Sequence, residues 1–119
     1  HKVFLAECKA HEARISFPDT GFDTDDYEKY LEIQKNSSFD FMLFFVDHRK
    51  QSIYGGDLSK ISAKSEWNGK VYPASEKNGI TYFPLRLMTK YFDLTEDEVE
   101  KLKSYTRESE SNKKLKESI

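Results

Sequence analysis

The alternation of apolar and polar stretches predicts two strands in the first half of the chain. Residues 3–6 form a short apolar run that ends in charged residues, which is the pattern of a strand buried on both faces. Residues 39–46 are almost wholly apolar and aromatic, and we expect them to form a central strand. Residues 10–22 hold Pro18, Gly21 and several polar side chains, so they are predicted to be a loop.

A helix is predicted between these two strands. Asp23 or Thr24 can cap its N-terminus, and two acidic residues follow in the first turn, where the helix dipole favours them. We expect the helix to run to about Asn36. Its predicted buried face carries four residues at helical spacing, namely Tyr27, Tyr30, Leu31 and Gln34.

The second half reads as short strands and turns. Residues 52–54 are predicted to pair antiparallel with the preceding strand, and residues 58–61 to form a helical turn that packs back onto the sheet. Residues 62–79 are polar and carry turn signals at 67–70 and 77–79, which predicts a hairpin or loop region.

The last part of the chain is predicted to hold one strand followed by helices. Residues 80–84 form a late strand whose proline favours its end or an edge position, and residues 85–92 are expected to form a short helix. Thr95 and Glu98 have the spacing of a capping box for a last helix. The fold class is therefore α/β, with a mixed four- to five-stranded sheet and flanking helices. We expect one domain over residues 1–106 and a charged helix end or tail over 107–119.

Composition narrows the setting in which the protein works. No apolar run approaches the roughly 20 residues needed to span a bilayer, which excludes membrane insertion. The single Cys8 cannot form an internal disulfide, which favours a reducing, cytoplasmic compartment. The chain opens at His1 without an initiator methionine, so we expect the complete protein to hold residues upstream of it.

Charge is distributed unevenly although the formal net charge is −2. Residues 15–47 carry eight acids against two lysines, a net charge of −6, whereas residues 48–92 carry eight cations against three acids, a net charge of +5. Such a segment can form a basic face that binds a phosphate backbone, or its lysines can simply be scattered over a solvated surface. The candidate nucleic-acid contacts are His11, Arg49, Lys50, Lys64 and Lys70.

The candidate chemistry lies at the end of the first predicted strand. Glu7 and Lys9 are separated by one residue, so on a strand their side chains point to the same face. A carboxylate beside an ammonium can bind Mg²⁺ or Mn²⁺ and activate a water against a phosphodiester. The backbone carbonyl of Cys8 would be a further oxygen ligand for the metal.

This Glu-x-Lys element, with the helix and apolar strand that follow it, resembles the PD-(D/E)xK superfamily of restriction-endonuclease-like enzymes and Holliday-junction resolvases. The resemblance covers roughly residues 3–61. It implies a restriction-endonuclease-like core and a magnesium-dependent endodeoxyribonuclease in which Glu7 ligates metal and Lys9 positions the water. Gln34 matches a glutamine that many members carry on this helix, facing the metal. DNA is the implied partner, and a homodimer is compatible with the resemblance.

One part of the family pattern falls outside the chain. The metal-binding Asp of the family normally lies upstream of the Glu-x-Lys strand, on a preceding hairpin strand. We therefore expect it, and full activity, only in a protein that extends beyond His1. The alternatives are a non-catalytic nucleic-acid-binding or assembly domain with a nuclease-like fold, and an interaction module whose last helix and tail dock a partner.

Each candidate residue also has a structural interpretation. Glu7 and Lys9 can form a surface salt bridge, and Gln34 can bond a backbone carbonyl. Cys8 can be a small buried apolar residue, and His11 a solvated loop residue.

Overall fold

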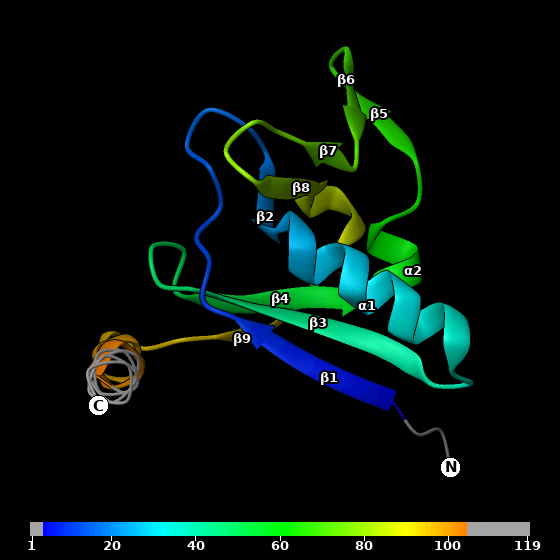
Figure 1. Ribbon diagram of the computed structural model, residues 1–119. Helices are drawn as coiled ribbons and strands as arrows, with labels where there is room; N and C mark the ends of the chain where they lie inside the picture. The colour runs from blue at the N-terminus through cyan, green and yellow to red at the C-terminus, as the bar shows by residue number, and fades with distance from the viewer. Residues whose placement is uncertain (1–3, 105–119) are drawn as a thin grey trace, which may run out of the picture.

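A four-stranded mixed sheet forms the base of the molecule in the computed structural model, which describes residues 4–104. Its strand order is β1-β3-β4-β9, and we call it sheet A. Strands β1 and β3 run parallel, whereas β3–β4 and β4–β9 are antiparallel pairs (Figure 1). The α/β class and the four-stranded mixed sheet with flanking helices are therefore confirmed. The strands of sheet A are β1 (Phe4–Lys9), β3 (Asp40–Asp47), β4 (Ser52–Asp57) and β9 (Thr89–Asp93).

Two smaller sheets, together with α1 and α2, lie above one face of sheet A, whereas the C-terminal helix lies beyond β9 (Figure 1). A three-stranded antiparallel sheet has the order β2-β8-β7, and β5 and β6 form a separate hairpin. Residues 96–104 are helical as well. The elements of this upper part are β2 (Asp19–Asp23), α1 (Thr24–Asn36), α2 (Leu58–Ile61), β5 (Ser65–Trp67), β6 (Lys70–Tyr72), β7 (Ala74–Ser75), β8 (Ile80–Pro84) and the 3-10 turn η1 (Leu85–Leu87).

The predicted helix is confirmed as α1. The carboxylate of Asp23 accepts a hydrogen bond of 3.0 Å from the backbone N–H of Asp25, so it caps the helix as expected. Tyr30 is buried, but Leu31 keeps 37% of its surface exposed, so the prediction that Leu31 faces the core was wrong. The less exposed positions Tyr27, Tyr30 and Gln34 form a stripe at i, i+3 and i+7 spacing along α1, and Leu31 lies at the edge of this stripe.

An aromatic core joins the layers. Phe22 of β2 is fully buried and its ring stacks on Tyr30 and Phe83, at centroid distances of 5.7 and 5.5 Å. Phe45 of β3 contacts the same ring at 6.0 Å. Contacts among these large rings hold α1, β2 and β8 onto sheet A.

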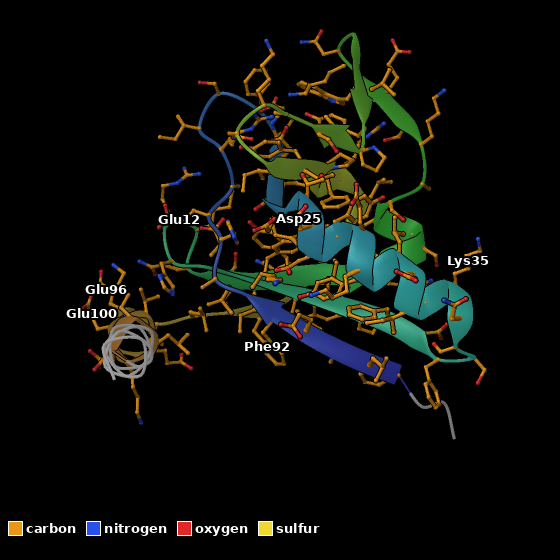
Figure 2. The ribbon with its side chains drawn as sticks, viewed as in Figure 1. Glu12, Asp25, Lys35, Phe92, Glu96 and Glu100 are labelled. Carbon is orange, nitrogen blue, oxygen red and sulfur yellow. The ribbon has the colours of Figure 1, made fainter. Side chains whose placement is uncertain are left out.

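Strand β3 is central, as predicted, but it is buried on one face only. Phe41, Leu43 and Phe45 are buried beneath the helices, whereas the alternate residues are partly exposed on the opposite face. Phe92 of β9 lies on that opposite face and is 63% exposed (Figure 2).

The first strand departs from its prediction. It extends to Lys9, and among residues 4–104 it pairs only with β3, so it is an edge strand of sheet A as described. Phe4 and Leu5 are accordingly 53% and 38% exposed, and the expectation of burial on both faces was wrong. An edge strand lacks a neighbour on one side, which leaves even apolar side chains open to solvent.

Two further predictions were wrong. Residues 19–22 belong to β2 rather than to a loop, because β2 pairs along its whole length with β8 and is buried there. Residues 85–92 do not form one helix: η1 covers three of them, and β9 begins at Thr89 and pairs with β4. Its β-branched and aromatic residues suit a strand.

Several local predictions are confirmed. The turn at 67–70 connects β5 to β6, and Pro84 ends β8. In the capping box, Thr95 N–H donates to Glu98 at 3.0 Å and Glu98 N–H donates to Thr95 at 3.1 Å. The predicted tail at 107–119 lies outside the described residues. Over residues 4–104, no helix has the length and apolarity needed to cross a bilayer.

Candidate functional site

Glu7 and Lys9 share one face of β1, as the sequence predicted. Glu7 pairs with Leu43 and Lys9 with Phe45, and both of these β3 residues point into the core beneath α1. Because neighbouring residues of paired strands share a face, Glu7 and Lys9 also point toward the α1 side of sheet A. Both are partly buried. The side chain of Cys8 is exposed and points to the opposite face.

Lys9 already has partners in the fold. Its ammonium forms an ion pair with Asp26 of α1, with 2.9 Å between Nζ and Oδ2. It also lies over the rings of Phe22 and Tyr30, at 5.4 and 5.1 Å from their centroids. Burial alone would lower the pKa of Lys9, but its interactions with Tyr30 and Asp26 outweigh burial and raise it. Lys9 is therefore a permanent cation at a fixed position.

Gln34 lies further along α1 than the contact with Lys9. Asp26 meets Lys9, and Tyr30 stacks on Phe41, the β3 residue that pairs with Leu5, so α1 runs back along β1 toward the start of that strand. Gln34 follows Tyr30 by four residues, about 6 Å along the helix axis, and its backbone therefore lies beyond the level of Leu5.

The side-chain oxygen of Gln34 has no hydrogen-bond partner. Its Oε1 is buried, and no donor within residues 4–104 bonds it. A buried acceptor without a donor costs about 1–3 kcal/mol. The structural alternative, in which Gln34 bonds a backbone carbonyl through its amide nitrogen, would leave this oxygen unexplained.

The described residues do not by themselves complete a metal site. Within residues 4–104, no group of three or more His, Cys, Asp or Glu side chains is arranged to hold a metal ion. Mg²⁺ requires several oxygen ligands in near-octahedral geometry. Glu7 and the Cys8 carbonyl would thus need further ligands from elsewhere in the protein.

His11 lies beside Lys9, in the connection that follows β1. Burial lowers the pKa of His11, the positive charge of Lys9 lowers it further, and Asp23 opposes both effects. The fold therefore favours the neutral imidazole of His11. A neutral ring can donate or accept a hydrogen bond but adds no positive charge for a phosphate.

A buried carboxylate fixes the connection between β1 and β2. Asp47, at the end of β3, is fully buried and accepts hydrogen bonds from Ala13 N–H at 2.8 Å, Lys50 N–H at 2.9 Å and the Tyr54 hydroxyl at 2.6 Å. Burial raises the pKa of Tyr54, and the neighbouring Asp47 raises it further. Arg49 donates to the carbonyl of Ala13. Sequence reasoning missed the role of Asp47, although an acid directly after a long apolar run was a visible signal.

The five candidate nucleic-acid contacts lie at separate places. Arg49 and Lys50 are exposed in the β3–β4 turn, at the same end of sheet A as Lys9. Lys64 follows α2, at the opposite end of that sheet (Figure 1). Lys70 forms an ion pair of 2.9 Å with Glu76, so its charge is locally balanced. The structure therefore brings Lys9, His11, Arg49 and Lys50 toward one end and leaves the other two apart.

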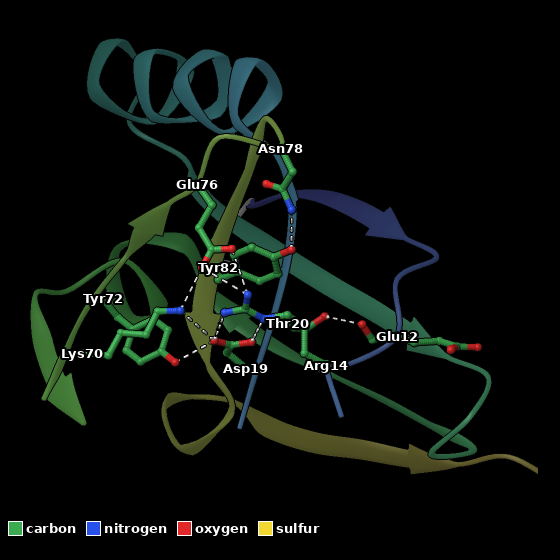
Figure 3. A network of polar contacts seen from close by, with 9 residues as sticks. All are labelled: Glu12, Arg14, Asp19, Thr20, Lys70, Tyr72, Glu76, Asn78 and Tyr82. Atoms are coloured by element: carbon green, nitrogen blue, oxygen red, sulfur yellow. Dashed lines mark hydrogen bonds and ion pairs between the residues drawn. The ribbon is translucent and has the colours of Figure 1, made fainter. Parts of the chain in front are cut away.

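A second polar network was also missed from the sequence (Figure 3). Asp19, fully buried in β2, accepts two hydrogen bonds of 2.7 and 2.6 Å from Arg14 and one of 2.6 Å from the Tyr72 hydroxyl. Arg14 also bonds both oxygens of Glu76 and lies over the ring of Tyr82, 3.5 Å from its centroid. Every charge in this network is paired, which indicates a structural role: it fastens the β5–β6 hairpin to β2 and β8.

Comparison of the chain with models of protein families, with curated proteins and with solved structures gave no match.

Proposed function

We propose that this chain is the core of a metal-dependent nuclease that hydrolyses DNA phosphodiester bonds. The observation that supports it most is that Glu7 and Lys9 share one face of β1, beneath α1, the helix that also carries the unpaired oxygen of Gln34. A carboxylate, a fixed cation and a free acceptor are the groups needed beside a phosphate and an attacking water.

The residues of this chain would have distinct tasks. The ammonium of Lys9 would stabilise the negative charge that develops on the phosphate during attack, and would help position the water. The unpaired Oε1 of Gln34 would accept a hydrogen bond from that water and orient it. Glu7 would contribute one carboxylate to the Mg²⁺ or Mn²⁺ that the resemblance implies, and a bound metal would supply charge neutralisation at the phosphate.

The edge position of β1 supports the proposal in a second way. Strand β3 occupies one side of β1, so the other side is open for pairing within the described sheet. A strand that precedes β1 in a hairpin would pair at that open side. The upstream Asp that the resemblance requires would then lie beside Glu7.

The test compares DNA cleavage by four variants of the complete protein. Glu7→Ala and Lys9→Ala are expected to lower DNA cleavage with Mg²⁺ on the order of 100-fold each. Glu12→Ala and Lys35→Ala remove the same charges from exposed positions, labelled in Figure 2, and should leave the rate unchanged. Cleavage at the unaltered rate by Glu7→Ala or Lys9→Ala would refute the assignment.

A non-catalytic DNA-binding domain with the same fold is the second candidate. It is favoured by the existing Lys9–Asp26 ion pair and by the lack of a three-ligand cluster among residues 4–104. Calorimetric titration of the complete protein with Mn²⁺ separates the two candidates. Heat of binding supports the nuclease, whereas no heat together with intact DNA binding supports the second candidate.

The cellular compartment and the oligomeric state are part of the same proposal. The free, exposed thiol of Cys8 suits the reducing cytoplasm. A homodimer, which the resemblance allows, is checked by sedimentation of the complete protein.

A further inference from the structure

Two adjoining hollows lie beside the β3–β4 turn. One has a volume of about 330 Å³ and the other about 200 Å³, and both are lined by Lys50 and Leu85. We call the pair the basic groove. Its cations are Arg14, Arg49, Lys50 and Lys90, and none of the residues that line it is acidic.

The cations of the basic groove differ in how far they are neutralised. Arg14 is fully engaged by Asp19 and Glu76. Lys90 lies 3.0 Å from Asp93, but both side chains are more than half exposed, and such a pair is weak. Arg49 is 4.0 Å from the nearest oxygen of Glu12.

Lys50 stands between the two hollows with its charge free. Within residues 4–104, no ion pair engages its ammonium, and it is the backbone N–H of Lys50 that donates a hydrogen bond to Asp47. Because Asp47 is buried and holds Ala13 and Tyr54 as well, the backbone beneath Lys50 is fixed. The groove therefore presents positive charge on a backbone that is already fixed in place.

The position of the groove connects it to the candidate site. Lys9 pairs with Phe45, and Asp47 follows two residues later, about 7 Å further along the strand. A strand of nucleic acid with one phosphate at Lys9 would therefore pass toward the β3–β4 turn. Successive phosphates carry one charge each, which matches a row of cations along two hollows better than it matches a single small anion.

We propose that the basic groove binds the phosphodiester backbone of the nucleic acid next to the cleavage point, with Lys50 and Lys90 as its principal contacts. This inference rests on the proposed function for the identity of the ligand. The apolar wall of Leu85 and Met88 would face the sugars. Duplex and single-stranded DNA share this backbone chemistry, and the experiment distinguishes them.

The experiment measures binding of fluorescein-labelled duplex and single-stranded DNA to the complete protein by anisotropy, over a range of salt. The double variant Lys50→Glu/Lys90→Glu is expected to bind at least ten-fold more weakly to one or both forms. The slope of log K against log salt should fall by about 2, because two phosphate contacts are lost. The form that loses affinity identifies the strand that the groove holds.

The matched control is Lys29→Glu/Lys35→Glu, which makes the same change in net charge on exposed positions of α1. It should change the affinity by less than two-fold. An equal loss in both double variants, no loss in Lys50→Glu/Lys90→Glu, or no binding of either DNA by the unaltered protein would overturn the inference. Thermal melting of both variants checks that they remain folded.

Failure of the groove and failure of the nuclease give different results. If Lys50→Glu/Lys90→Glu loses DNA binding while Glu7→Ala still cleaves at the unaltered rate, the groove stands and the assigned catalytic centre falls. If Glu7→Ala abolishes cleavage while Lys50→Glu/Lys90→Glu binds normally, the groove falls and the catalytic centre stands.

Discussion

The buried carboxylate of Asp47 allows a sharp test of how the candidate end of the sheet is held together. Substitution by alanine leaves the Ala13 N–H and the Tyr54 hydroxyl without an acceptor. Each buried donor left unpaired costs about 1–3 kcal/mol, whereas the N–H of Lys50 is only part-buried and can turn to water. Two such donors should together lower the free energy of unfolding in Asp47→Ala by about 2–6 kcal/mol, a large part of the roughly 5–15 kcal/mol of a typical domain.

The assay is urea denaturation followed by tryptophan fluorescence and circular dichroism, in a double-mutant cycle with Tyr54→Phe. Tyr54→Phe removes one donor from a carboxylate that keeps two others, so its own cost should be about 1.5–2 kcal/mol. In the Asp47→Ala background that cost should shrink, giving a coupling free energy of about 1–2 kcal/mol. Hydrogen exchange at the Ala13 amide should also accelerate in Asp47→Ala.

Asp40→Ala is the matched control, because Asp40 is an exposed acid at the other end of β3. It should change the free energy of unfolding by no more than about 0.5 kcal/mol. The reasoning is refuted if Asp47→Ala costs less than about 1 kcal/mol, or if its coupling to Tyr54→Phe is zero.

Three further predictions follow from single residues. The pKa of His11, measured by NMR, should lie below about 6.5, and Lys9→Met should raise it. Because folding lowers this pKa, the contribution of His11 to stability is complete above its unfolded-state pKa and is lost as the pH falls through its folded-state pKa, a loss that His11→Gln should reduce. Gly55→Ala should lower the free energy of unfolding, measured in urea, by at least about 2 kcal/mol, because a Cβ there would lie 1.9 Å from the carbonyl oxygen of Leu43. An unchanged free energy of unfolding would contradict the close approach of β3 and β4. Gln34→Leu should leave stability unchanged or raise it by about 1 kcal/mol while lowering cleavage; a loss of more than about 1 kcal/mol would mean that Oε1 has a partner.

The parts of the fold that could be predicted are those specified by local chemistry. The cap of α1 depends on Asp23 and its immediate neighbours, and the capping box depends on Thr95 and Glu98 alone. Strand β3 is indicated by six consecutive apolar residues at positions 41–46. Such signals act over a few positions, so a single sequence reveals them.

The missed strands depend on distant partners. Strand β2 carries Asp19 and Gly21, which have low strand propensity, yet Asp19 is satisfied by Arg14 and Tyr72. At Gly21 a Cβ would lie 2.2 Å from the Thr81 carbonyl oxygen, so glycine is what allows β8 to approach. Tertiary contacts of this kind override local propensity, and no local pattern encodes them.

The sequence predicted that Glu7 and Lys9 share a face of β1, but it did not predict the contacts around them. The alternation of a strand was enough to place Glu7 and Lys9 on one face. The ion pair of Lys9 with Asp26 and the unpaired oxygen of Gln34 could not be foreseen, because both depend on the depth and register of α1 over β1.

The parallel pairing of β1 with β3 has a consequence for the order of folding. Lys9 meets Phe45, 36 residues further along the chain, whereas β3 and β4 are joined by a short turn. Closing the longer loop costs more chain entropy, and non-local strand pairs form slowly. During synthesis β1 would emerge first and wait for β3 before docking. We expect Leu5→Ala to speed unfolding with little effect on the folding rate in stopped-flow kinetics, and the reverse would show that β1 belongs to the folding nucleus. Glu7 and Lys9 would then be brought to their places in the last step of folding.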